Sequence, residues 1–144
     1  MRKATAYLMA FLGPCLALQG TIYAETPLRS ALAIEALKKG ASATGWASYY
    51  TRESCEREGT SGIMANGKPL DDGALTCALW GIPFGTKIKV TRGERNIIVT
   101  TTDRGPLKRF MVEQGRIIDL TQYAFSLLGD IREGLIPVTV ERVN

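Results

Sequence analysis

The feature that most restricts the fold is a series of short strand-like stretches, each ended by glycine, proline or a charged turn. In residues 87–91 lysines alternate with apolar residues, a pattern typical of a strand with one face in water and one in a core. Residues 97–102 are all β-branched, which suits a half-buried strand. Six such stretches are expected, at residues 45–50, 74–79, 87–91, 97–102, 117–120 and 138–143. They predict a mainly β fold, a small closed barrel that leaves no sheet edge free.

The connections between these stretches are uneven. Residues 92–96 have the length of a hairpin turn, whereas residues 51–72 and 107–116 are predicted to be long polar loops that cross the barrel. Thr121 is expected to cap a helix over residues 122–128 that stops at Gly129. A second short helix is expected over residues 28–39, with Ser30 as its cap.

The first 24 residues have the order of a secretory signal peptide: a basic head, an apolar run over residues 4–18, and a small residue, Ala24, at the expected cleavage site. A retained membrane anchor is the alternative, although the run is short for a bilayer and Pro14 interrupts it. Lipidation of Cys15 is a further alternative, which Pro14 disfavours. We therefore expect export to the periplasm or cell envelope, a leader over residues 25–43, and one domain over residues 44–144.

The charge, the cysteines and the lack of histidine exclude several classes of binding site and enzyme. The chain carries a net charge of +4, part of which belongs to the signal peptide, and it has no basic run that would indicate a nucleic-acid partner. Outside that segment, Cys55 and Cys77 form an even pair, which in an oxidising compartment favours a disulfide over two buried thiols or a metal site. The chain has no histidine, so a zinc site lacks its usual nitrogen ligand, and no Ser-His-Asp triad or Cys-His pair is possible. We expect no metal and no cofactor.

Acid–base chemistry must therefore come from carboxylates, lysine, tyrosine or cysteine. Asp103 follows the β-branched stretch directly and precedes Arg104-Gly105-Pro106, so a strand becomes an exposed loop at this residue. An Asp before a turn often only bonds its own backbone, and this structural role stays open.

Six short motifs, in the same order and spacing, resemble the rare lipoprotein A domain, and the likeness covers about residues 44–143. They are Gly45-Trp46-Ala47-Ser48-Tyr49-Tyr50, Met64-Ala65-Asn66-Gly67, Leu75-Thr76-Cys77-Ala78, Ile82-Pro83-Phe84-Gly85-Thr86, Thr102-Asp103-Arg104-Gly105-Pro106 and Arg116-Ile117-Ile118-Asp119-Leu120-Thr121. The resemblance implies a six-stranded double-psi β-barrel with one or two short helices. It also implies an endolytic lytic transglycosylase, which cuts peptidoglycan glycan strands and leaves 1,6-anhydro ends.

The same resemblance implies that Asp103 is the catalytic carboxylate, acting as both acid and base. Two positions depart from the family: Lys68 replaces a common Glu, and Leu79 replaces a common His. A non-catalytic glycan-binding barrel therefore remains the alternative function. In either case the expected partner is the glycan strand, bound by a monomer. The candidate substrate-binding residues are Tyr50, Asn66, Lys68, Trp80 and Arg104.

Three further carboxylates receive a structural interpretation. Asp119, between two apolar residues just before the predicted helix, is expected to cap amides or to pair with Arg116. Asp71 and Asp72 lie in a polar loop and are expected to face water, although either could compensate for the missing Glu.

Overall fold

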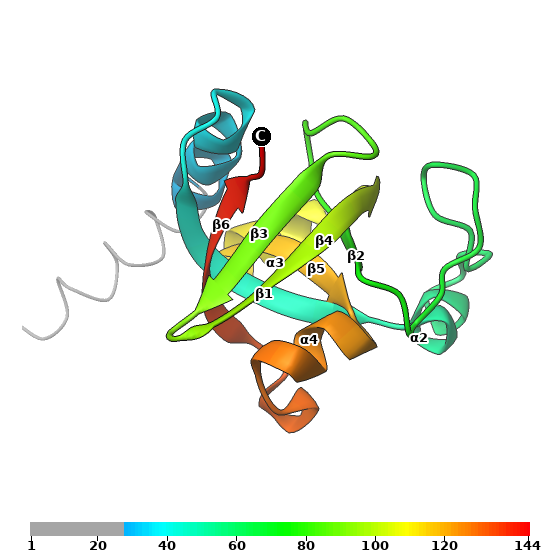
Figure 1. Cartoon of the computed structure of the whole chain (residues 1–144). Helices are drawn as coiled ribbons and strands as arrows, with labels where there is room; N and C mark the ends of the chain where they lie inside the picture. Colours follow the sequence, from blue (N-terminus) through cyan, green and yellow to red (C-terminus); the bar gives the residue numbers. More distant parts are fainter. Residues whose placement is uncertain (1–27) are drawn as a thin grey trace, which may run out of the picture.

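The computed structural model describes residues 28–144, so the signal peptide predicted for residues 1–24 lies outside the described part. The described chain forms a closed barrel with the strand order β1-β5-β2-β4-β3-β6 (Figure 1). The strands are β1 (Ala43–Tyr50), β2 (Thr76–Ala78), β3 (Lys87–Arg92), β4 (Arg95–Asp103), β5 (Arg116–Thr121) and β6 (Ile136–Arg142). The predicted closed six-stranded barrel is confirmed.

Parallel pairing distinguishes this barrel from a simple up-and-down arrangement. β1 runs parallel to β5 and β2 runs parallel to β4, while the other four pairings are antiparallel. β1 and β2 are consecutive in the chain but have β5 between them in the barrel, and β4 and β5 have β2 between them, so the segments that join these strands cross over a neighbouring strand. The short β2 consequently lies between two strands that follow it much later in the chain.

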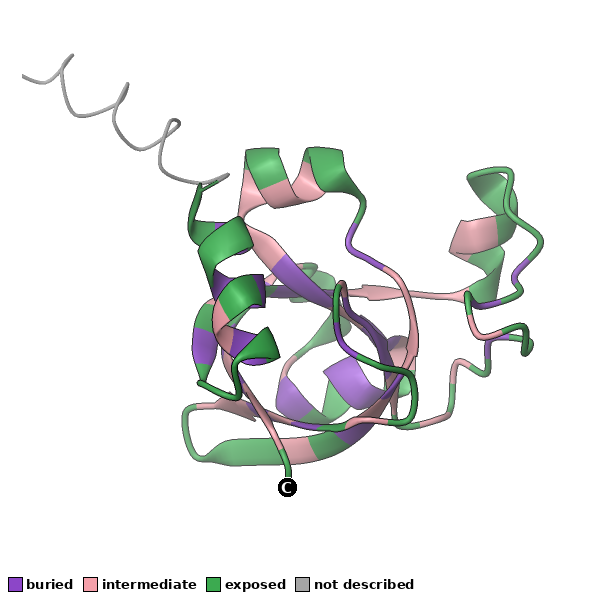
Figure 2. Ribbon diagram, turned by 90° about the horizontal axis from the view of Figure 1, so that it is seen from above, coloured by how far each residue is buried: buried purple, intermediate pink, exposed green. Residues whose placement is uncertain are grey.

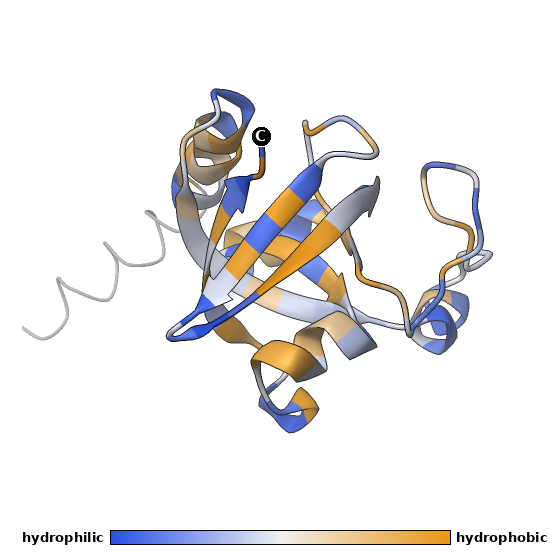
Figure 3. Ribbon diagram, in the orientation of Figure 1, coloured by the Kyte–Doolittle hydropathy of each residue, from blue (hydrophilic) through white to orange (hydrophobic). Residues whose placement is uncertain are grey.

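The barrel interior is filled by one face of each strand. Along β3, Ile88 and Val90 are fully buried while the intervening lysine is not, and the alternation is visible as stripes in Figure 3. The buried residues gather inside the ring of strands in Figure 2, together with apolar side chains of the helix that closes one end. That helix is α4 (Gln122–Leu128), which begins at the Thr121 cap and ends at Gly129, as predicted.

The other helices differ from the sequence predictions in number and position. The described residues hold four short helices rather than one or two. α2 (Arg52–Arg57) and α3 (Lys108–Gln114) lie within the stretches predicted to be loops, and a 3-10 turn follows α4 at Ile131–Glu133. The expected N-terminal helix spans residues 28–38 and places Leu37 in the core. Its predicted cap is wrong, because Ser30 lies inside the helix and its hydroxyl donates to the Met111 carbonyl at 3.1 Å.

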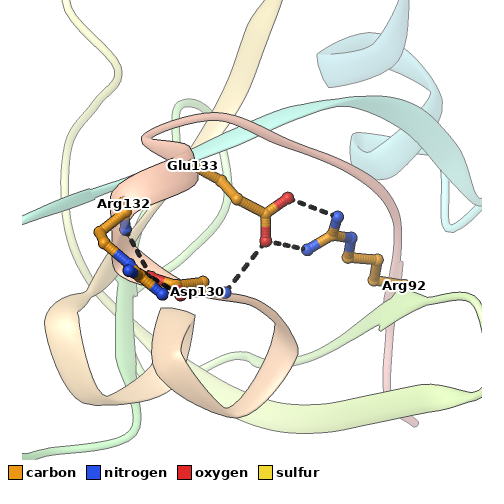
Figure 4. Close-up of polar contacts among 4 residues, drawn as sticks. All are labelled: Arg92, Asp130, Arg132 and Glu133. Atoms are coloured by element: carbon orange, nitrogen blue, oxygen red, sulfur yellow. Dashed lines mark hydrogen bonds and ion pairs between the residues drawn. The ribbon is translucent and has the colours of Figure 1, made fainter.

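An ion-pair cluster ties the end of β3 to the segment after α4 (Figure 4). The guanidinium of Arg92 donates from both terminal nitrogens to the Glu133 carboxylate, at 2.9 and 2.7 Å, and reaches the Leu128 carbonyl at 3.4 Å. The Glu133 carboxylate also accepts a hydrogen bond from the backbone amide of Asp130. The side-chain carboxylate of Asp130 in turn binds Arg132. A bidentate arginine pair of this kind fixes geometry as well as charge.

The predicted disulfide is wrong for this structure, in which Cys55 and Cys77 are both free thiols. Cys77 is fully buried in the barrel core, with its sulfur 3.9 Å from Oγ1 of Thr101. Cys55 lies on α2, outside the barrel, where it lines an external cleft. The two thiols therefore belong to different sides of the barrel wall. No helix in the described part of the chain combines the length and the apolar character needed to cross a membrane.

Candidate active site

Two carboxylates flank one small residue in the wall of the barrel. Ala78 on β2 is the register partner of Asp103 on β4 and of Asp119 on β5. Residues directly opposite each other on neighbouring strands point to the same face of a sheet. The Cα atoms of the two aspartates are separated by two inter-strand spacings, about 10 Å. Strands from distant parts of the sequence thus bring the carboxylates to one surface.

That surface forms the floor of an external cleft of about 380 Å³. Its walls come from β1, from α2 and the turn after it, and from α3. The lining includes both carboxylates of the floor together with Ser48, Tyr50, Glu58, Arg104, Phe110 and Arg116. The floor is kept open by small residues. A Cβ added to Gly105 would lie 3.1 Å from both the Ala78 Cβ and Oδ2 of Asp119, so a larger residue there would press on the carboxylate.

Asp103 is held by backbone amides. Its Oδ1 accepts from the amide of Ala65 and from that of Arg104, both at 2.8 Å. The hydrogen bond from the Arg104 amide is the structural role that the sequence left open for Asp103. The Asp103 side chain makes this bond and also lines the cleft. The Arg104 guanidinium turns elsewhere: it donates to the Leu79 carbonyl at 3.0 Å and lies 3.9 Å above the ring of Phe84. Arg104 thus braces the loop after β4.

The surroundings of Asp119 strongly perturb its pKa. Burial raises its pKa to about 6, although a hydrogen bond from Ser48 and the nearby Arg116 charge act in the opposite direction. The Ser48 hydroxyl donates to Asp119 Oδ1 at 2.6 Å and accepts from Arg116 at 2.9 Å. The carboxylates of Glu58 and Asp103 add smaller upward contributions to this pKa. A carboxyl group with a pKa near neutrality in a cleft is a candidate general acid.

The sequence assigned Asp119 a structural role, and the expected link to Arg116 runs through Ser48. The signal that could have identified it is its place between Ile118 and Leu120: both are fully buried, so the residue between them faces out. Sequence reasoning also missed Glu58, which lies at the end of α2 and lines the same cleft.

Two donors in the cleft, the Tyr50 hydroxyl and Nε of Arg116, are buried without a well-formed hydrogen bond in the described part of the chain. The Asp103 carboxylate nevertheless lies close enough to the Tyr50 hydroxyl to interact with it. Burial raises the pKa of Tyr50, and the Asp103 and Asp119 carboxylates contribute in the same direction, so the phenol keeps its proton. Buried polar atoms normally find partners. These two are placed to bind polar groups of a ligand in the cleft.

The other predicted binding residues are dispersed. Asn66 and Lys68 belong to one tight turn, in which Asn66 Oδ1 accepts from the Lys68 amide at 3.0 Å, and neither lines the cleft. Trp80 lies against the N-terminal helix and α3, and its indole donates to the Pro106 carbonyl at 2.7 Å. Leu79 is fully buried in the core. Of the five predicted binding residues, the structure brings Tyr50 and Arg104 to the cleft with Asp103.

The sequence-predicted loop carboxylates also lie outside the cleft. Asp71 Oδ1 accepts from the Gly73 amide at 2.9 Å, and Asp72 Oδ1 accepts from the Arg52 amide at 2.8 Å, so both stabilise local backbone. Within residues 28–144 no group of three or more His, Cys, Asp or Glu side chains is arranged to hold a metal ion.

Comparison with known proteins places this chain in a family. A family model described as lytic transglycolase, of the double-psi β-barrel type, matches residues 42–140. The chain is 39% identical over 100 residues to a probable endolytic peptidoglycan transglycosylase RlpA of Nostoc sp., covering 67% of this chain and 24% of the relative. It is 34% identical over 101 residues to the endolytic peptidoglycan transglycosylase RlpA of Rickettsia felis, covering 68% of this chain and 41% of the relative. The chain thus spans less than half the length of either relative.

Solved structures agree on the fold. The Streptomyces papain inhibitor has a TM-score of 0.54 and 27% identity, covering 73% of this chain and 96% of the inhibitor. An expansin of Clavibacter michiganensis has a TM-score of 0.50 and 22% identity, covering 72% of this chain and 50% of the expansin. With the barrel, the motifs and the family model in agreement, the chain belongs to the double-psi β-barrel lytic transglycolase family, the family of the rare lipoprotein A domain.

Proposed function

We propose that this chain cleaves the glycan strands of peptidoglycan as an endolytic lytic transglycosylase, with the cleft above Ala78 as its active site. The observation that carries the proposal is the pair of carboxylates, Asp103 and Asp119, at one register on either side of Ala78. Family membership and the names of the relatives supply the substrate class. Because that polymer lies outside the cytoplasm, the proposal includes export to the cell envelope.

The reaction needs one proton donor and one proton acceptor. The C6 hydroxyl oxygen of the sugar attacks its own C1, the bond from C1 to the leaving oxygen breaks, and no water is consumed. A carboxylic acid protonates the leaving oxygen, and a carboxylate takes the proton of the C6 hydroxyl. The product ends in a 1,6-anhydro sugar, and the two proton transfers leave the enzyme with the same number of protons.

We assign these two roles to different residues. Asp119, with a pKa of about 6, keeps its proton over part of the physiological range and serves as the acid. Asp103, fixed by the amides of Ala65 and Arg104, serves as the catalytic carboxylate that accepts the C6 proton. The Tyr50 hydroxyl, beside Asp103, and Nε of Arg116 are buried donors that line the cleft, and they bind sugar hydroxyls. In the simpler scheme predicted from sequence, Asp103 performs both transfers and Asp119 only shapes the cleft.

Digestion of purified, peptide-stripped glycan strands, followed by mass spectrometry for anhydro ends, tests the proposal. We expect anhydro products from the unmodified chain and a loss of roughly a hundredfold or more in rate for Asp103→Asn and for Asp119→Asn. Asp71→Asn, which removes an exposed loop carboxylate, is the control and should retain activity. Full activity in Asp119→Asn alone would favour the scheme in which Asp103 acts as both acid and base.

A non-catalytic glycan-binding barrel is the second candidate. It is favoured by Lys68 and Leu79, because the first is exposed outside the cleft and the second is buried in the core, so neither supplies the group that the family commonly has. Strand binding without any anhydro product, under conditions in which a known lytic transglycosylase cleaves, would establish this candidate and refute the enzymatic proposal.

A further inference from the structure

A second hollow, of about 640 Å³, lies on the outside of the barrel over β1, β3 and β6. Trp46 lines it, and 42% of this residue is exposed. Three threonines form a row across the same strands, because Thr44 pairs with Thr139 and Thr139 pairs with Thr91. We call the hollow defined by Thr44, Trp46, Thr91 and Thr139 the Trp46 groove.

The Trp46 groove and the catalytic cleft share one strand. Ala43 and Ala47 of β1 are buried in the core, so the alternate residues 44, 46, 48 and 50 point outward. Thr44 and Trp46 line the groove, whereas Ser48 and Tyr50 line the cleft. At the strand rise of about 3.3 Å per residue, Trp46 and Tyr50 are about 13 Å apart along β1.

The neighbouring strand β5 likewise begins at the boundary between the groove and the cleft. Arg116 on β5 is the register partner of Trp46 and lines the cleft, while the preceding Gly115 lines the groove. Gly115 also accepts the backbone hydrogen bond of Trp46, at 3.2 Å. The two hollows therefore meet at the pair Trp46–Arg116, and a linear polymer bound in the cleft along β1 runs directly into the groove.

The chemistry of the groove fits sugar rings. An indole presents a flat apolar face that covers the C–H face of a pyranose, and threonine hydroxyls both donate and accept hydrogen bonds. Arg92 also lines the groove, but its guanidinium is already bound to the Glu133 carboxylate (Figure 4). The charge of Arg92 is thereby balanced. Arg29 of the N-terminal helix also lines the groove, so one further cation lies beside the indole and hydroxyl groups that suit a sugar.

We infer that the Trp46 groove is a distal glycan-binding subsite, continuous with the catalytic cleft, in which Trp46 stacks on a sugar ring several units from the cleaved bond. The inference rests on the proposed function, since the occupant is the same glycan strand. It assigns a role to a residue outside the cleft, and it makes affinity depend on strand length. Trp46 binds and positions the substrate but takes no part in the proton transfers.

Binding measurements on length-sorted glycan strands test this inference. The Asp103→Asn background prevents turnover, and titration calorimetry compares a disaccharide with strands long enough to pass Ser48. Trp46→Ala should weaken long-strand binding by roughly three- to tenfold, the range of an aromatic contact, and leave disaccharide binding unchanged. Trp46→Phe should recover most of the affinity. Tyr123→Ala, which removes an aromatic residue of similar exposure on α4, should bind both ligands normally.

Kinetics in the active chain give the second readout. With long strands, Trp46→Ala should raise KM by the same factor and leave kcat unchanged, because the contact is made outside the reacting sugar. Equal long-strand affinity in Trp46→Ala and the unmodified background would overturn the inference, even if anhydro products form. Absence of anhydro products with a length-dependent loss on Trp46→Ala would instead refute the catalytic proposal and retain the subsite.

Discussion

Replacement of Asp119, in the floor of the cleft, by asparagine should stabilise the protein at neutral pH. Burial raises the pKa of Asp119 from 3.8 to about 6, so the folded state binds this proton more tightly than the unfolded chain. Stability therefore falls as pH rises between these values, and above pH 6 ionised Asp119 carries the full penalty. At about 1.4 kcal/mol per pKa unit the penalty is about 3 kcal/mol.

Asp119→Asn removes that penalty and keeps an oxygen that can accept the hydrogen bond from Ser48. The penalty of about 3 kcal/mol already includes the favourable Arg116 charge, and burying the amide of Asn offsets part of the gain. We therefore expect a net gain of about 1–3 kcal/mol at pH 7 and almost none at pH 4. Urea unfolding of both proteins at the two pH values measures this difference. Glu94→Gln, in the exposed turn between β3 and β4, matches the charge change and should show no such pH dependence. A destabilised variant at pH 7, or a gain that is equal at both pH values, would refute the reasoning.

Three further predictions concern the cleft, the barrel wall and the thiols. Ser48→Ala removes a hydrogen bond that lowers the pKa of Asp119, so the decline of kcat/KM with rising pH should move to higher pH in a pH–rate profile. Gly45→Ala places a Cβ 2.7 Å from a buried isoleucine of β5 and should reduce stability by about 1–3 kcal/mol in urea unfolding. Alkylation with mass detection should label Cys55 in the native protein and Cys77 only after unfolding.

The first two of these predictions have a matched control, and the third has a direct contradicting result. Ser61→Ala changes an exposed serine and should leave the pH–rate profile in place. Gly73→Ala adds a Cβ whose nearest neighbour lies at an ordinary 3.4 Å, so its unfolding curve should barely move. A mass two protons lower under non-reducing conditions would contradict the free thiols.

The barrel strands could be predicted because their residues carry the pattern locally. Ile88 and Val90 alternate with lysines, and the run that precedes Asp103 is wholly β-branched. Helices α2 and α3 could not be predicted in this way, since they have six and seven residues and no fully buried side chain, so no apolar periodicity reveals them. Capping by Thr51 and Ser54 stabilises α2 instead.

The site was predictable only in part for a related reason. The motif at residues 102–106 singled out Asp103 as a candidate, but the role proposed for Asp119 depends on which strands become neighbours. Nothing local to Asp119 indicates that Ala78 will lie beside it and Asp103 beyond. The same limitation explains Cys77: the sequence led us to expect an oxidising compartment and hence a disulfide, but it does not indicate that Cys77 points into the core.

The three-residue length of β2 also has a kinetic consequence. Thr76 pairs with Thr100, and Ala78 pairs with Asp119, so β2 gains its partners only after long loops have closed. Contacts of such sequence separation slow folding, and so short a strand is a natural place for local opening. The two carboxylates should thus become neighbours late in refolding. Amide exchange at Leu79, whose N–H donates to the Asp103 carbonyl at 3.1 Å, would report the same event in the native protein.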